Sequence, residues 1–508
     1  MLVFLSLNFA YYKLKEGKFN MQIEAHDLYK VLQAKFGFST FKLGQLEIIH
    51  HLCNSKNVLA VLPTGTGKSL IYQLLGYLLN RPVIVISPLI SLIDDQVARL
   101  NRLGEKHVVG LTSKLDHNQR EFTLNHLRNY RFIYLSPEMA TQPEVLNALK
   151  QLDYGLFVID EAHCLSQWGP DFRPDYLKLK DLLSQLGSPT TLMLTATATK
   201  SVREDILKKM GFHSDQVEQV VYSVDRPNIY LDVEHCETPA QKNKKLFKLL
   251  KMIKGSGIIY FSSKKIANQM TELIAQQTDR SVAAYHADVS LQDRYRIQQQ
   301  FMLGKVNVIC ATSAFGMGID KNNVRFVIHY HMPGNLEDYL QEIGRAGRDQ
   351  QPSIAILLYT AGDEYIPSTL NMKGFPSASN VQTFFAKPES RASFEPDQKQ
   401  LLTYYHDQHK SAQEVSQIFE NRQVAKQNSL MQMLNFVNEE NCLRNNLLTH
   451  FGEQEVTHNA NCCGIDCVFE AVATLKLTET SEVEQDSNQS LSLVPWQTRL
   501  NQLFSQKK

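Results

Sequence analysis

The sequence repeats one pattern from residue 58 to residue 359: a short apolar run, a polar turn and then a helical stretch. Continuous apolar runs that alternate with helices are typical of parallel strands covered on both faces. The first series of runs covers residues 58–62, 83–87, 132–136, 156–160 and 191–196, and the second covers residues 257–261, 282–286, 306–311, 326–330 and 353–359. We therefore predict an α/β fold of two parallel-sheet lobes in tandem, joined within residues 211–228. One large doubly wound sheet is the alternative.

The rest of the chain divides around these lobes. We predict an N-terminal extension over residues 1–20, the first lobe over 21–210 and the second over 211–360. Residues 361–470 combine a proline- and serine-rich connector with a helical subdomain, because apolar side chains recur at helical spacing between residues 398 and 451. The acidic, Ser- and Thr-rich tail within residues 471–508 is expected to be partly disordered.

Charge and cysteine content exclude several classes of protein. Lysine and arginine (53) balance aspartate and glutamate (52), so a nucleic-acid partner must bind in a local groove. The apolar run at residues 1–10 lacks a basic leader and is too short for a bilayer, which argues against a signal peptide or membrane anchor. Eight cysteines are too few for a disulfide scaffold, and four of them crowd between residues 442 and 467. A reduced, cytoplasmic location with one metal site fits better than secretion.

A glycine-rich turn follows the first predicted strand and precedes a helical stretch. The turn contains Thr64, Gly65, Thr66, Gly67, Lys68 and Ser69. Its glycines let the backbone N–H groups and the helix start face one anionic group. We expect Lys68 to reach the terminal phosphates of ATP and the Ser69 hydroxyl to bind Mg²⁺. Leu62 stands where the general phosphate-loop pattern has glycine, so a glycine-rich turn without nucleotide is the alternative.

Two acidic residues end the run at residues 156–160 and begin the sequence Asp160-Glu161-Ala162-His163. An acid at the carboxyl end of a parallel strand, in the same lobe as a phosphate loop, is suited to hold Mg²⁺. Asp160 fits that role, and Glu161 can polarise the attacking water. A helix cap is the alternative use of such acids.

With these motifs, the chain resembles the RecQ family of DNA helicases over about residues 28–467, in the family order. Residues 36–45 resemble the opening motif, residues 87–97 and 134–138 strand-contacting motifs, and residues 194–199 the segment that links the ATP state to DNA. The resemblance implies two RecA-like lobes, the first of which binds ATP. The resemblance also implies roles for individual residues. Phe41 and Gln45 would contact the adenine, and Lys42 beside them replaces the arginine that the family usually has. The residues implied at the DNA are Ser87, Pro88, Thr195 and Thr197.

The stretch at residues 166–174 resembles the aromatic-rich loop that separates this family from other two-lobed helicases. Trp168 and Phe172 can stack on unpaired bases, and Arg173 can hold a phosphate or stack. Pro170 stands where the family usually has histidine. A packed surface loop with a buried tryptophan is the alternative.

In the second lobe, residues 225–228 resemble the lobe entrance, residues 285–287 the next motif, residues 311–321 the fifth and residues 341–349 the sixth. The resemblance implies that Thr312 contacts DNA and that Gly318 and Asp320 contact the nucleotide. Arg345 and Arg348 lie three apart, so on a helix both would point the same way. We predict that Arg348 approaches the γ-phosphate, with Arg345 as its neighbour, and that catalysis needs closure of the lobes. A structural salt bridge is the alternative.

The crowded cysteines resemble the zinc-binding region that follows the lobes in this family. Cys442, Cys462, Cys463 and Cys467 could close a tetrahedral Zn²⁺ site, although the adjacent Cys462 and Cys463 break the usual spacing. His450 or His458 could replace one thiolate. A helical region with buried or free thiols is the alternative.

The resemblance implies an ATP-dependent DNA helicase that moves 3′→5′ on single-stranded DNA and unwinds duplex junctions in repair or recombination. ATP, Mg²⁺ and Zn²⁺ are the expected cofactors, and we expect a monomer with no membrane partner. After Cys467 there is little room for the winged-helix and helical nucleic-acid domains of longer relatives, so strong unwinding is not expected. The alternatives are a DNA-stimulated ATPase that separates no strands, and an RNA-directed DEAH-type ATPase, which should lack the aromatic-rich loop.

Overall fold

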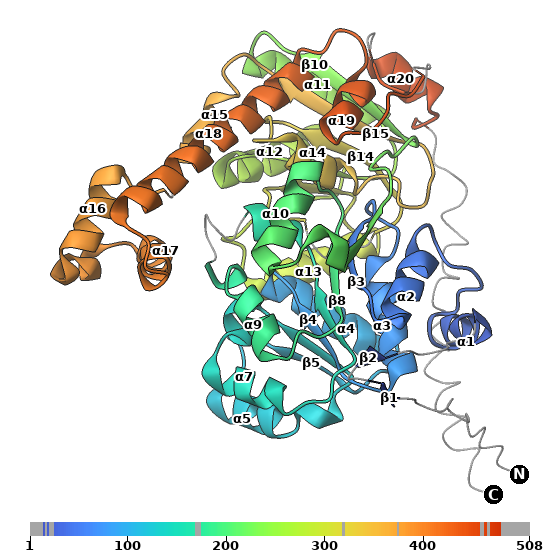
Figure 1. Cartoon of the computed structure of the whole chain (residues 1–508). Helices are drawn as coiled ribbons and strands as arrows, with labels where there is room; N and C mark the ends of the chain where they lie inside the picture. Colours follow the sequence, from blue (N-terminus) through green and yellow to red (C-terminus); the bar gives the residue numbers. More distant parts are fainter. Residues whose placement is uncertain are drawn as a thin grey trace, which may run out of the picture.

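The computed structural model describes residues 14–15, 18–19, 25–167, 174–316, 321–372, 375–457, 462–464 and 468–478. Within them the chain forms two stacked lobes, each with a parallel sheet, and a helical C-terminal region (Figure 1). Outside the lobes, β1 (Leu14–Lys15) and β2 (Lys18–Phe19) pair as an antiparallel hairpin. The predicted fold class is confirmed.

The first lobe contains a seven-stranded sheet in the order β5-β6-β4-β7-β8-β3-β9. Its central strands are buried along their whole length, as their continuous apolar sequences predict for strands covered on both faces. The strands are β3 (Asn57–Val61), β4 (Val83–Ile86), β5 (Val108–Leu111), β6 (Phe132–Leu135), β7 (Leu156–Ile159), β8 (Thr191–Thr195) and β9 (Val217–Val221). The helices are α1 (Ala25–Val31), α2 (Gln45–Cys53), α3 (Lys68–Leu79), α4 (Ile90–Arg102), α5 (His117–Asn125), α6 (Pro137–Ala140), α7 (Pro143–Lys150), α8 (His163–Gln167), α9 (Leu179–Gln185) and α10 (Lys200–Met210).

The second lobe contains a six-stranded parallel sheet in the order β10-β15-β14-β11-β13-β12. The chain leaves the first sheet after β9 and enters the second at β10, so the junction lies at the end of the expected 211–228 region. The strands are β10 (Ile229–His235), β11 (Ser256–Tyr260), β12 (Val282–Tyr285), β13 (Val308–Ala311), β14 (Val324–His329) and β15 (Ser353–Tyr359). The helices are α11 (Pro239–Met252), α12 (Lys264–Gln277), α13 (Leu291–Met302) and α14 (Leu336–Ile343).

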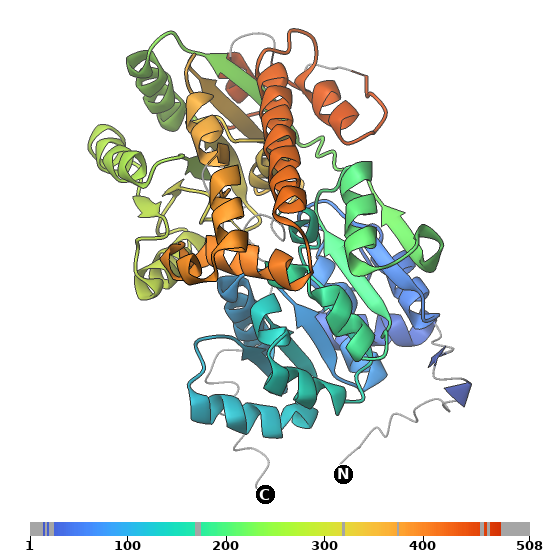
Figure 2. The same cartoon turned by 60° about the vertical axis from the view of Figure 1, so that its left-hand side comes forward.

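The C-terminal helices divide into two groups. The first group, which we call the arm, has its own small core, formed by α16, α17 and the first half of α18. The second half of α18 and α19 pack into the core of the second lobe instead. The arm projects to the side in Figure 1, and in the turned view of Figure 2 its orange helices lie in front of the lobes. The helices are α15 (Tyr365–Met372), α16 (Ala378–Ala386), α17 (Pro396–Asp407), α18 (Ala412–Val437), α19 (Leu443–His450) and α20 (Val468–Thr474).

None of the described helices combines the length and the apolar character that a membrane crossing requires.

Candidate active site

A tight loop joins β3 to α3 at the carboxyl edge of the first sheet. Gly65 and Gly67 adopt φ angles of 86° and 75°, a left-handed region in which a side chain would strain the backbone. Lys68 begins α3, and its Nζ donates a hydrogen bond to the carbonyl oxygen of Leu62 (3.2 Å). Ser69 follows on the first turn of the helix. The N–H groups at the start of a helix and the Lys68 ammonium together suit a phosphate.

The opening motif supports this loop from α2. Gln45 is buried, and its Nε2 donates to the carbonyl oxygens of Thr66 (2.8 Å) and Gly67 (3.1 Å). Its Oε1 accepts the backbone N–H of Lys42 (2.9 Å). Phe41 is half-buried and packs edge-on against a tyrosine ring of α1. The Gln45 amide therefore fixes the shape of the loop, a role that the sequence analysis did not foresee.

Two carboxylates lie beside Lys68 at the end of β7. Burial and the neighbouring Glu161 carboxylate raise the pKa of Asp160 to about 7, while Lys68 opposes this shift. Burial lowers the pKa of Lys68, although Glu161 and Asp160 favour its charged form. Glu161 has a φ of 51°, which is unusual for a residue with a side chain and typical of functional sites. The strand end thus gathers the charges that a magnesium nucleotide would neutralise.

His163 lies beside Glu161 and forms a hydrogen bond with a residue of β8. His163 Nδ1 lies 3.4 Å from Glu161 Oε2 and 2.9 Å from Thr195 Oγ1. The Thr195 hydroxyl donates to the carbonyl oxygen of Thr197 (3.0 Å), so His163 donates to Thr195. Burial lowers the pKa of His163, which favours the neutral ring. Thr195 and Thr197 are both buried. Through the contacts of His163 and Thr195, the surroundings of Glu161 extend to the segment after β8.

Arg345 and Arg348 follow α14 but point to different partners. The prediction that a helix directs both the same way is wrong, because α14 ends at Ile343 and turns follow it. Arg345 is buried and donates to the carbonyl oxygen of Gly316 within the second lobe. Arg348 crosses to the first lobe: a Cβ placed on Gly65 would lie 3.3 Å from its Cγ. Its charge also disfavours the charged form of Lys68, so the two cations lie close together.

The expected DNA-contacting residues lie at the ends of strands in both lobes. Ser87 and Pro88 follow β4, and the buried Ser87 donates its N–H to the carbonyl oxygen of Leu135 (2.9 Å). Thr312 follows β13 and donates its N–H to the carbonyl oxygen of Tyr285 (3.2 Å). Several expected site residues lie outside the described part of the chain: Trp168, Phe172, Arg173, Gly318, Asp320, His458 and Cys467.

The arm reaches the first lobe on both sides of residues 168–173. Arg422 of α18 donates to the carbonyl oxygen of Ser166 (3.1 Å). Gln400 of α17 donates to Oδ2 of Asp175 (2.8 Å). These partners are 256 and 225 residues apart in the sequence, so no local pattern predicts them. The arm therefore contacts the first lobe at residues that lie at the two ends of the expected aromatic-rich loop in the sequence.

Three cysteines meet between α19 and β10. Cys442 Sγ lies 3.8 Å from Cys462 Sγ and 3.6 Å from Cys463 Sγ, and all three thiols are buried. A tetrahedron with Zn–S bonds of about 2.3 Å has edges of about 3.8 Å, so the thiol spacing fits zinc. Burial raises the pKa of Cys463 to about 12, so a metal would have to displace its proton. His450 hydrogen-bonds Glu337 (3.0 Å) and is not part of this described cysteine group.

Arg444 connects the cysteines to the junction between the lobes. Its Nε donates to Cys462 Sγ (3.3 Å), and its Nη2 donates to the carbonyl oxygens of Cys462 (3.0 Å) and Ile229 (2.6 Å). Its Nη1 pairs with Asp225 and donates to the carbonyl oxygen of Arg226 (3.2 Å). One buried guanidinium thus holds the cysteine region against the start of the second lobe.

Three family models match the chain. Residues 42–206 match the DEAD/DEAH box helicase model, residues 241–350 the helicase conserved C-terminal domain, and residues 398–468 the RecQ zinc-binding model. The last range contains all four of the crowded cysteines.

Curated relatives extend these matches along the chain. The chain is 38% identical to a probable ATP-dependent DNA helicase RecS of Bacillus subtilis, over 94% of this chain and 98% of that protein. It is 38% identical to the ATP-dependent DNA helicase RecQ of Haemophilus influenzae, over 67% of this chain and 54% of that protein. The chain therefore spans about half the length of that RecQ protein.

Solved structures with related folds include Mycobacterium smegmatis helicase Lhr bound to single-stranded DNA and AMP-PNP. That structure has a TM-score of 0.55 and 20% identity, over 72% of this chain and 50% of the other. The structure of the DEAD-box helicase Mss116 bound to single-stranded RNA and UDP-BeF has a TM-score of 0.57 and 16% identity, over 77% of this chain and 91% of the other. At these identities the likeness supports the two-lobed fold alone.

Proposed function

Because the chain belongs to the RecQ family of ATP-dependent DNA helicases, we propose that it uses ATP hydrolysis to move 3′→5′ on single-stranded DNA and to unwind duplex junctions during repair or recombination. The observation that carries this proposal is the meeting of Arg348 with Gly65 and Lys68 across the two lobes. An arginine supplied by a second lobe makes hydrolysis depend on the distance between the lobes, which is what a motor requires. We place this activity in a cytoplasmic monomer.

The residues around the phosphate loop divide the work of hydrolysis. The turn of Thr64, Gly65, Thr66 and Gly67 would hold the phosphates, with Lys68 neutralising their charge. Ser69 and Asp160 would hold Mg²⁺, which when bound neutralises phosphate charge. Glu161 would orient the attacking water, while Arg348 approaches the γ-phosphate. Phe41 would contact the adenine, and Gln45 would do so by exchanging its hydrogen bonds to the Thr66 and Gly67 carbonyl oxygens for the adenine edge. Gly318 and Asp320 would complete the site from the second lobe.

DNA contacts would alternate between the lobes during this cycle. Ser87 and Pro88 in the first lobe and Thr312 in the second would touch the strand. The His163, Thr195 and Thr197 chain would pass the state of Glu161 to that surface. Contacts to the backbone of the strand make such binding insensitive to sequence and weaker at high salt.

A strand-displacement assay on a 3′-tailed duplex tests the proposal. We expect ATP-dependent displacement of a labelled strand, and faster ATP hydrolysis with single-stranded DNA than with RNA. DNA-stimulated hydrolysis without displacement would support the non-unwinding ATPase. Preferential stimulation by RNA would support an RNA-directed enzyme.

Replacing Trp168 with alanine is expected to lower stimulation by DNA about tenfold while basal hydrolysis stays within about twofold. The reason is that a stacked base contributes roughly 1–3 kcal/mol, and the loop would report DNA to the adjacent acids. Hydrolysis with and without oligo-dT measures both quantities. Trp496→Ala, which removes the other tryptophan, is the control. Equal loss of basal and stimulated rates would indicate a packing role.

We further propose that Cys442, Cys462, Cys463 and Cys467 bind one zinc ion. Purified protein is expected to contain about one zinc per chain. Cys442→Ser should remove it and lower the melting temperature, because structural zinc stabilises the folded state directly. Cys53→Ser, which alters a buried thiol of the first lobe, should keep the metal. Folded, active wild-type protein without zinc would refute this site.

A further inference from the structure

Arg226 lies between the two lobes and binds backbone oxygens of both. It is 8% exposed and belongs to the segment that joins β9 to β10. Its Nη1 donates to the carbonyl oxygen (3.1 Å) and the hydroxyl (3.3 Å) of Thr64 in the phosphate loop, and to the carbonyl oxygen of Gly344 (3.3 Å). Its Nη2 donates to the carbonyl oxygens of Ala346 (3.1 Å) and Gly347 (2.6 Å). One guanidinium therefore holds the phosphate loop and the turn that precedes Arg348.

The 344–347 turn is fixed from a second side by Asn228. Asn228 Nδ2 donates to the carbonyl oxygens of Gly347 (2.8 Å) and Gln351 (3.0 Å). Gly347 has a φ of 56°, and a Cβ there would clash with Asn228 Nδ2. A Cβ on Gly344 would clash with Oγ1 of Thr64, whose hydroxyl donates to the Gly344 carbonyl oxygen (2.8 Å). The turn thus packs directly on the phosphate loop.

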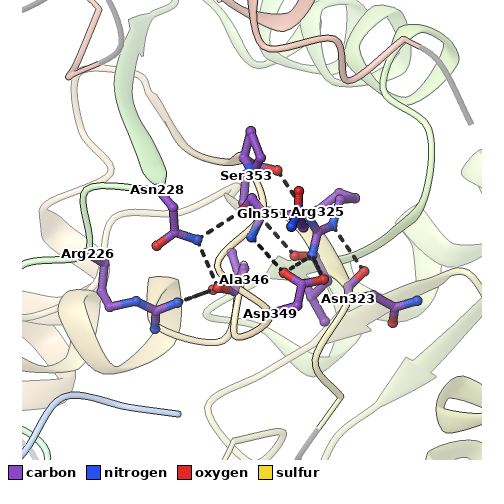
Figure 3. A network of polar contacts seen from close by, with 11 residues as sticks. Arg226, Asn228, Asn323, Arg325, Ala346, Asp349, Gln351 and Ser353 are labelled. Carbon is purple, nitrogen blue, oxygen red and sulfur yellow. Dashed lines mark hydrogen bonds and ion pairs between the residues drawn. The ribbon is translucent and has the colours of Figure 1, made fainter. Parts of the chain in front are cut away.

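Figure 3 shows Arg226 and Asn228 on one side of this turn and the contacts that hold its far side. On the far side, Arg325 forms two hydrogen bonds with the Asp349 carboxylate, at 2.6 and 2.5 Å. Asp349 Oδ1 also accepts the backbone N–H of Gln351 (3.1 Å). These contacts are internal to the second lobe, whereas Arg226 also reaches the first lobe. Arg226 is therefore placed to couple the shape of the turn to the position of the phosphate loop.

The electrostatics of Arg226 argue against a role in stability alone. Among the described residues, its hydrogen-bond partners are four carbonyl oxygens and one hydroxyl, while the adjacent Asp225 pairs with Arg444. Burial, followed by the nearby Arg348 charge, lowers the pKa of Arg226 to about 10. A buried cation near a second cation is costly, and such arrangements concentrate at functional sites.

We propose that Arg226 is a positioning residue for hydrolysis, which seats the 344–347 turn on Thr64 and thereby presents Arg348 to the nucleotide. The inference rests on the proposed ATPase function. A planar guanidinium can bind oxygens of both loops at once, whereas a lysine ammonium is a single point charge. Arg226 would therefore act through Arg348, without touching the substrate.

The test is a pair of lysine substitutions at arginines that donate to backbone carbonyl oxygens, one of which, Arg226, is buried and the other, Arg280, partly buried. Arg226→Lys is expected to lower the DNA-stimulated kcat about 30-fold, with the KM for ATP and the affinity for a fluorescent ADP analogue within about threefold. The matched control is Arg280→Lys, because Arg280 also donates to carbonyl oxygens, of Leu250 (3.0 Å) and Gly255 (2.9 Å), but only within the second lobe. This control should keep the kcat within about twofold.

A double mutant decides whether Arg226 acts through Arg348. In an Arg348→Ala background, measured by single-turnover hydrolysis at high enzyme concentration, Arg226→Lys should cost less than about threefold. An equal cost in both backgrounds, or a loss of ADP-analogue affinity and melting temperature in step with kcat, would overturn the positioning role. An unaffected kcat in Arg226→Lys would do the same. Wild-type protein without DNA-stimulated hydrolysis would instead refute the proposed function itself.

Discussion

Replacing Lys68 with alanine is expected to lower ATP turnover by about 10³-fold or more, while the affinity for single-stranded DNA stays within about threefold. Lys68 begins α3 beside Asp160 and Glu161, so its ammonium would face the phosphates of a bound nucleotide. Without it, the two carboxylates would repel the nucleotide. The expected loss corresponds to about 4 kcal/mol of transition-state stabilisation.

Two measurements separate hydrolysis from DNA binding in this variant. A coupled ATPase assay with saturating oligo-dT reports turnover, and fluorescence anisotropy of a labelled strand reports affinity. Lys56→Ala is the control. Lys56 immediately precedes β3 and is exposed, and its Nζ lies 3.9 Å from Oε1 of Glu218. Parallel loss of hydrolysis and DNA binding in Lys68→Ala would contradict separate sites for the two ligands.

The interior of each sheet was predictable because its signal is local. Strands such as β4 and β7 are continuous apolar runs, and both faces of them are buried. The strands β5, β9 and β10, which were missed, are three of the four edge strands of the two parallel sheets, where partial exposure permits polar residues and glycine. The fourth edge strand, β12, was predicted because its short apolar run is uninterrupted. The weakness of the apolar signal at an edge therefore has a physical cause.

The candidate site shows the same division between local and distant information. The phosphate loop and the acids after β7 are each encoded within a few consecutive residues. The directions of Arg345 and Arg348 were predicted wrongly, although Gly344 and Gly347 in the sequence were a signal that the helix ends before them.

Contacts to backbone oxygens leave no pattern in the sequence. Arg226 and Thr64 are 162 residues apart, and a carbonyl oxygen does not depend on the identity of its side chain. His163 was visible beside Glu161, but its bond to Thr195 required the pairing of neighbouring strands. The residues that couple the lobes are therefore recovered from the three-dimensional structure.

Replacing Arg348 with alanine is expected to lower kcat by about 10³-fold, with the KM for ATP changed less than about threefold. The reason is that an arginine from the second lobe would stabilise charge that develops only in the transition state, so the ground-state complex should lose little. Its position against Gly65 brings it to the phosphate loop with the lobes in contact. Steady-state hydrolysis with saturating oligo-dT measures both parameters.

The two arginines of the sixth motif can be distinguished in the same experiment. Arg345 binds the carbonyl oxygen of Gly316, so Arg345→Ala should lower the melting temperature as well as activity. Arg296→Ala, which removes an exposed arginine of α13, is the control and should leave both turnover and melting temperature nearly unchanged. If Arg348→Ala kept its turnover and Arg345→Ala lost it without loss of stability, the transition-state role would pass to Arg345. Hydrolysis would then depend on the contact of Arg345 with Gly316 in the fifth motif, and not on the contact of Arg348 with Gly65.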